Sequence, residues 1–82
     1  MNSLTNLKNL GEKSARMLIE AGIKTEADLR RMGAVEAYRR VKHVNPGRVS
    51  LLMLYALQGA LMDLHWSRIP DDIKADLKRQ VS

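Results

Sequence analysis

The sequence contains no cysteine, so it can form neither a disulfide framework nor a thiolate metal site. Aromatic residues are scarce, with one tryptophan, two tyrosines and no phenylalanine, which removes the stacking platforms that grip unpaired bases. The longest unbroken apolar run covers residues 51–57, far short of the ~18 residues that a membrane-spanning helix needs. Residues 1–4 show no sign of a secretory signal. We therefore expect a cytoplasmic protein that does not enter a membrane.

The chain also offers no recognisable catalytic or metal-binding constellation. A length of 82 residues with 45% hydrophobic content has room for a single domain, residues 1–82. The two histidines, His43 and His65, lie far apart in the sequence without a carboxylate cluster beside them, which is not a zinc pattern. No Ser–His–Asp or acid–base pair has supporting spacing, and no glycine-rich loop joins a strand to a helix. We expect no enzymatic activity, no cofactor and no small-molecule substrate.

Positive charge is concentrated in one segment. The 14 lysines and arginines outnumber the 9 aspartates and glutamates, giving a net charge of +5 and an isoelectric point near 10.0. Basic and acidic residues balance in residues 1–29 and again in 49–82, so the whole surplus lies in residues 30–48. In that segment Glu36 is the one acidic residue beside Arg30, Arg31, Arg39, Arg40, Lys42 and Arg48. This local excess of positive charge favours an anionic partner, most often nucleic acid. A helix face that is simply solvated has the same pattern.

Every periodic segment of the chain predicts helix, and none shows the sustained alternation of a strand. Thr25 and Asp28 form a Thr-x-x-Asp arrangement that is typical of a helix start, and Gly22 and Gly33 are placed as helix ends. We expect a short opening turn near residues 4–7 and helices over about 11–21, 25–33, 34–44 and 49–64, with a last helix opened by Pro70.

The segment 49–64 is apolar nearly all round, which predicts a helix that is buried on most sides and forms the centre of the fold. Before it, Asn45 and Pro46 have the residue types of an N-cap and a first helical position. The preceding helix carries an apolar stripe that extends to Val44, and Trp66 is expected to pack as core at the end of the bundle.

Residues 7–15, Leu-Lys-Asn-Leu-Gly-Glu-Lys-Ser-Ala, resemble the helix-hairpin-helix signature Leu-Pro-Gly-Ile-Gly followed by three variable residues and Ala. Asn9 replaces the first glycine, and asparagine is the least costly other residue at positive φ. In such a motif, free N–H groups from Gly11 onward attract a phosphate, and Gly11 itself is expected at positive φ. Lys13 and Arg16 follow on the next turns, as phosphate contacts or as ordinary solvated charges.

Over residues 4–78 the chain resembles the C-terminal domain of the TfoX/Sxy family. The likeness is clearest in residues 33–41, Gly-Ala-Val-Glu-Ala-Tyr-Arg-Arg-Val, and continues through residues 54–60 and His65-Trp66. The resemblance implies an all-helical bundle of five to six short helices with a helix-hairpin-helix-like N-terminal half. It also implies a bacterial positive regulator of natural competence, acting at promoters with the cyclic-AMP receptor protein. The first half is similar to the C-terminal domain of the RNA polymerase α subunit, which touches DNA and activators.

Two functions remain open at this point. In the first, the chain is a non-catalytic regulatory module that contacts the backbone of duplex DNA weakly; in the second, it docks an acidic surface of a transcription factor or RNA polymerase. The candidate contact residues for either function are Gly11, Lys13, Arg16, Arg30, Arg31, Arg39, Arg40, Lys42 and Arg48. Because Glu12 stands at the hairpin and Asn9 departs from its motif, we expect residues 30–48 to supply the main surface.

Overall fold

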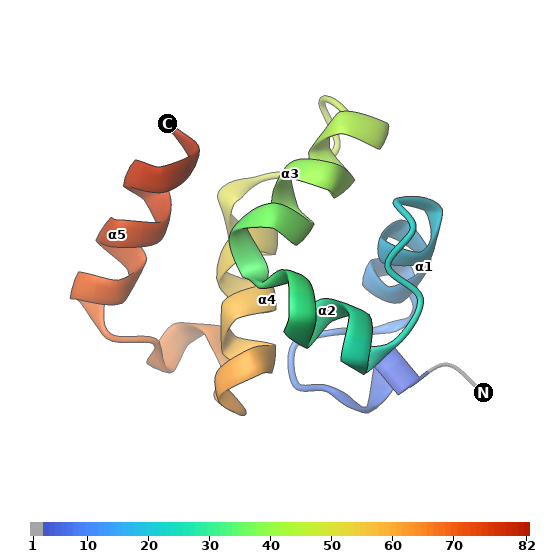
Figure 1. The fold of residues 1–82 in the computed structure, drawn as a ribbon. Helices are drawn as coiled ribbons and strands as arrows, with labels where there is room; N and C mark the ends of the chain where they lie inside the picture. The colour runs from blue at the N-terminus through green and yellow to red at the C-terminus, as the bar shows by residue number, and fades with distance from the viewer. Residues whose placement is uncertain (1–2) are drawn as a thin grey trace.

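The computed structural model describes residues 3–82, and over that range the chain folds into helices joined by turns and short connections (Figure 1). No strand occurs in this part of the chain. The elements are the short 3-10 helix η1 (Ser3–Asn6), then α1 (Glu12–Glu20), α2 (Glu26–Met32), α3 (Ala34–Val44), α4 (Leu51–Met62), the 3-10 helix η2 (Trp66–Arg68) and α5 (Asp71–Val81). The prediction of an all-α bundle of five to six short helices is confirmed.

Helix α4 forms the centre of the fold, as its composition predicts. Helix α3 packs along α4, α5 contacts both of them, and α1 and α2 pack against α3 (Figure 1). The side chains of Leu54, Leu57 and Ala60 are buried in this arrangement. Burial on most sides does not extend to the first turn, where Leu52 is 48% exposed. The core therefore lies along the later turns of α4, and the first turn opens to the surface.

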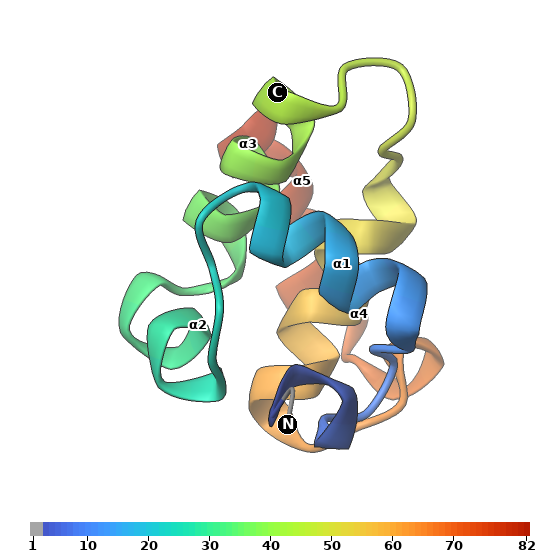
Figure 2. The same cartoon turned by 90° about the vertical axis from the view of Figure 1, so that its right-hand side faces the viewer.

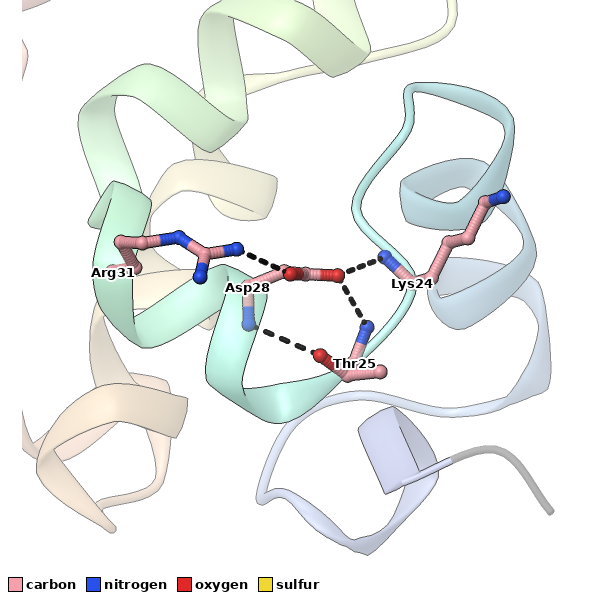
Figure 3. A network of polar contacts seen from close by, with 4 residues as sticks. All are labelled: Lys24, Thr25, Asp28 and Arg31. Atoms are coloured by element: carbon pink, nitrogen blue, oxygen red, sulfur yellow. Dashed lines mark hydrogen bonds and ion pairs between the residues drawn. The ribbon is translucent and has the colours of Figure 1, made fainter.

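The start of α2 is fixed by a reciprocal cap between Thr25 and Asp28 (Figure 3). The Asp28 N–H donates to the Thr25 hydroxyl at 3.1 Å, and the Thr25 N–H donates to the Asp28 carboxylate at 3.2 Å. The Lys24 N–H donates to the same carboxylate oxygen at 3.2 Å, while Arg31 donates to the other oxygen at 2.6 Å. The Lys24 N–H lowers the pKa of the Asp28 carboxyl, desolvation raises it in part, and Thr25 and Arg31 lower it further. The predicted helix start is confirmed.

The connection between α3 and α4 differs from the prediction. Asn45 does not cap a following helix; it ends α3, and its N–H donates to the Val41 carbonyl at 2.9 Å. Gly47 has φ +93°, a conformation outside any helix, so a helix cannot begin at Pro46. Helix α4 begins instead at Leu51. The turn of residues 46–48 thereby becomes an exposed bridge between the two helices.

The apolar stripe of α3 also ends one turn earlier than expected. Ala34, Ala37, Tyr38 and Val41 are buried, but Val44 is 46% exposed. Val44 is the last residue of α3, and the last turn of this helix reaches beyond the first turn of α4 (Figures 1 and 2).

Asn9 occupies the turn between η1 and α1 at φ +70°, which confirms the positive φ expected of it. Its carboxamide has a second role that the motif does not indicate. The Nδ2 group donates to the carbonyl oxygens of Leu64 at 2.9 Å and Ala56 at 3.3 Å, and Oδ1 accepts the Trp66 N–H at 3.1 Å. The half-buried Trp66 is thus held at the end of α4. One side chain joins the hairpin turn to the central helix.

Gly11 does not adopt the positive φ that we expected. As the N-cap residue of α1, it has φ −94° and ψ −172°, which is extended backbone that other residues also adopt. A β-carbon at Gly11 would meet no atom within 4 Å. The strained position of the hairpin is Asn9, and Gly11 is neither strained nor crowded.

Candidate functional site

The two arginines of α2 hold ion pairs within their own helix. Arg30 Nε lies 2.8 Å from a carboxylate oxygen of Glu26, and Arg31 pairs with Asp28. Both pairs are exposed and individually weak. Pairs spaced three or four residues apart on a helix can be recognised in the sequence. The carboxylates of Glu26 and Asp28 partly neutralise these two arginines, so the positive potential of residues 30–48 is smaller than the residue count suggests.

The basic residues of α3 have partners of different kinds. Arg40 pairs with Glu36 at 3.1 Å, which confirms a pairing visible from the spacing. Arg39 donates to the Gln80 carbonyl oxygen at the end of α5, at 2.6 Å. The Lys42 ammonium lies 5.7 Å from the centre of the Tyr38 ring, a cation–π contact. Of these three contacts, the one made by Arg39 joins two helices, and the other two lie within α3.

Three other candidates converge from separate parts of the chain. Lys13 and Arg16 on α1 and Arg48 in the turn before α4 line one cleft of about 430 Å³. Figure 2 shows α1 beside the segment that leads into α4. No ion pair among the described residues involves any of these three side chains. We call this the basic cleft; it is completed by Met17, Glu20 and Asn45.

The basic cleft contains a polar group that lacks a partner. The Nδ2 group of Asn45 is buried and makes no hydrogen bond to the protein. A buried donor without an acceptor costs about 1–3 kcal/mol. Glu20 is the acidic residue in the lining, and it forms no ion pair with the cations. No sequence pattern predicts that Asn45 lines this cleft, because its place there depends on how α1 packs beside the turn.

A second cleft adjoins the first and shares Lys13, Met17 and Arg48 with it. Its volume is about 330 Å³, and we call it the apolar cleft. The polar residues on its lining are Asn9, Ser14 and Ser50. The apolar ones are Met17, Val49, Leu52, Met53, Ala56 and Trp66. No acidic residue lines it. The sequence did not point to this surface, because an apolar helix over residues 49–64 is expected to be buried on most sides.

The remaining candidates lie apart from these two clefts. Gly11 stands at the start of α1, where the first-turn N–H groups have no partner within the helix. Glu12 borders a different cleft of about 440 Å³ together with Arg16. Arg39 and Arg40 border another, of about 370 Å³, beside His43 and Glu36. The structure therefore does not bring the nine candidates onto one surface.

Residues 3–82 contain neither a cluster of metal ligands nor a membrane-spanning helix. No group of three or more histidine or carboxylate side chains is placed to hold a metal ion, and no helix is long and apolar enough to cross a membrane.

The chain is similar to one protein family, to a curated protein and to solved structures. A family described as the TfoX C-terminal domain matches residues 1–81. The DNA transformation protein TfoX1 of Aliivibrio fischeri (strain ATCC 700601 / ES114) is 30% identical over 78 residues, which cover 95% of this chain and 37% of that protein. The chain thus spans little more than a third of the length of this curated relative.

The solved structures are similar over nearly the whole chain. An uncharacterized protein from Listeria monocytogenes, in a triclinic crystal form, has a TM-score of 0.87 and 36% identity, covering 94% of this chain and 86% of that one. A protein of unknown function from Listeria monocytogenes, in a tetragonal form, has a TM-score of 0.86 and 37% identity, covering 93% of each chain.

Proposed function

This chain belongs to the TfoX C-terminal domain family, and we propose that it is a non-catalytic module of competence regulation that contacts the backbone of duplex DNA through the basic cleft. The observation that carries the proposal is the convergence of Lys13, Arg16 and Arg48, none of them in an ion pair. The setting in DNA transformation rests on the name of the relative from Aliivibrio fischeri.

The chemistry of the basic cleft suits phosphate rather than bases. Ammonium and guanidinium groups bind phosphate oxygens, and arginine does so through two parallel hydrogen bonds. Phosphate contacts position a protein on DNA without reading its sequence, so the expected binding is weak and insensitive to base order.

A salt titration tests the proposal. We expect the chain to bind a short duplex with a Kd of about 10⁻⁴–10⁻⁶ M near physiological salt, measured by fluorescence anisotropy. The logarithm of the binding constant should fall against the logarithm of salt concentration with a slope of about −0.9 for each phosphate neutralised. Changing the DNA sequence at constant length should leave the affinity unchanged.

The matched variants keep the change in charge constant. Lys13→Gln/Arg48→Gln removes two cations from the basic cleft, and Lys24→Gln/Lys78→Gln removes two that line none of the clefts. The cleft pair should reduce the slope by about two, while the control pair should change it by much less. Equal effects of the two pairs, or binding that ignores salt, would reject DNA contact at this cleft.

A further inference from the structure

We infer that the apolar cleft binds a short segment of a partner protein in which an aspartate or glutamate adjoins large apolar side chains. This inference goes beyond the proposed DNA contact, because phosphate groups bind to cations and gain nothing from the apolar side chains that line this cleft. It concerns the lining contributed by Leu52, Met17 and Met53, which the DNA proposal leaves without a role.

The floor of the cleft combines an exposed apolar side chain with two adaptable ones. Leu52 is 48% exposed although it belongs to the central helix, and covering it would remove apolar surface from water. Met17 comes from α1 and Met53 from α4, and methionine side chains adjust to ligands of different shape because they are unbranched and flexible. Trp66 adds an aromatic wall that the Asn9 contacts hold in place. Surfaces of this composition suit an apolar anchor from a partner.

The charged side chains that line the apolar cleft favour a partner of negative charge. Lys13 and Arg48 line the cleft, and no acidic residue does. The first turn of α4 also carries no acidic side chain, and Ser50 makes no side-chain capping bond, in contrast with the acidic first turns of α2, α3 and α5. An acidic group beside the anchor would therefore meet two cations and the positive end of α4. This charge complementarity excludes basic segments and favours acidic ones.

The probe is a labelled helical peptide with leucines at i, i+3, i+4 and i+7 and glutamates at the flanking positions. Its control replaces every glutamate with lysine. Binding is followed through the ¹³C-methyl signals of the methionines, because Met17 and Met53 line the cleft whereas Met32 and Met62 do not. We expect the glutamate peptide to shift the Met17 and Met53 signals saturably and the lysine peptide to leave them unmoved.

A matched pair of variants separates the cleft from general apolar exposure. Leu52→Gln changes the cleft floor, and Ile19→Gln changes another exposed side chain that does not line it. Both residues lie at the surface, so both variants should fold. We expect Leu52→Gln to weaken peptide binding about tenfold and Ile19→Gln to leave it nearly unchanged.

Several results would overturn the inference. These are equal binding of the lysine peptide, equal effects of Leu52→Gln and Ile19→Gln, and the absence of saturable shifts up to about 1 mM peptide. Met53 lines the apolar cleft and not the basic cleft, so a shift of its signal by duplex DNA, with none from the peptide, would assign the apolar cleft to DNA. Leu52→Gln should keep its affinity for duplex DNA, so failure of the peptide inference is distinguishable from failure of the DNA proposal.

Discussion

The carboxamide of Asn9 occupies the space that a β-carbon would need at Gly59. A β-carbon built on Gly59 would lie 2.5 Å from Asn9 Nδ2 and 2.6 Å from the Leu64 carbonyl oxygen, closer than real contacts allow. Gly59 therefore lets the hairpin turn approach the end of α4, where Asn9 bonds to Ala56 in the helix and to Leu64 and Trp66 just after it. The clefts beside α1 depend on this approach, because it fixes where α1 begins relative to α4.

Gly59→Ala should destabilise the fold, although alanine is the better helix former. Helix propensity alone predicts a gain of about 1 kcal/mol. The crowding at Asn9 and Leu64 opposes it, and we expect a net loss of about 1–3 kcal/mol in the free energy of unfolding. Chemical denaturation measures the change. Gly11→Ser is the control, since that position is open and an N-cap serine should be neutral or stabilising. A gain in stability for Gly59→Ala would contradict the account.

Asn9→Gly restores the residue of the helix-hairpin-helix signature, yet the structure predicts that it destabilises the chain. Glycine relieves the positive φ at this position, worth up to about 1 kcal/mol. It also removes three partly buried hydrogen bonds and leaves the Trp66 N–H without its acceptor, at a cost of about 1–3 kcal/mol. We expect a lower melting temperature in a thermal scan. A higher one would mean that the turn, and not the carboxamide, controls this junction.

The Asp28 cap predicts a loss of stability in acid. Its pKa is lowered in the folded state, first by the Lys24 N–H, so its contribution is complete above the unfolded-state pKa and disappears as the pH falls through the folded-state pKa. We expect urea denaturation to show the native chain more stable than Asp28→Asn at neutral pH. This difference should shrink as the pH falls into the range below the ordinary aspartate pKa. A difference that stays constant across that range would rule out the carboxylate as its source.

Asp63 ends α4 in the left-handed region, at φ 57° and ψ 41°. Glycine adopts this conformation without steric cost, and a negative charge at a helix C-terminus is unfavourable. Asp63→Gly should therefore raise the free energy of unfolding by about 0.5–1 kcal/mol in denaturant titrations. Asp63→Asn removes only the charge and should give a smaller gain. If both variants lose stability, the Asp63 carboxylate makes a stabilising contact that outweighs the cost of its charge and its backbone conformation.

Local signals in the sequence were enough to predict most of the fold. The bounds of α3, the cap of α2 and the positive φ of Asn9 each depend on residues within one or two turns of each other. The start of α4 was mispredicted for a local reason as well, because Asn45 and Pro46 have the residue types of a helix start and the conformation of Gly47 decides against them.

The candidate site could be predicted only in part. Lys13, Arg16 and Arg48 were all expected as contacts, but their convergence depends on the packing of α1 beside the turn before α4, which no periodicity encodes. The same holds for the burial of the Asn45 amide and the exposure of Leu52, since neighbouring elements cover the first and leave the second open.

The most direct test compares the two basic surfaces in one salt titration with duplex DNA. Lys13→Gln/Arg48→Gln alters the basic cleft, and Arg39→Gln/Arg40→Gln removes the same charge from α3. The account predicts that the first pair flattens the salt slope by about two and weakens binding, while the second pair stays close to the native chain. Flattening by the second pair alone would contradict it and return the contact surface to α3.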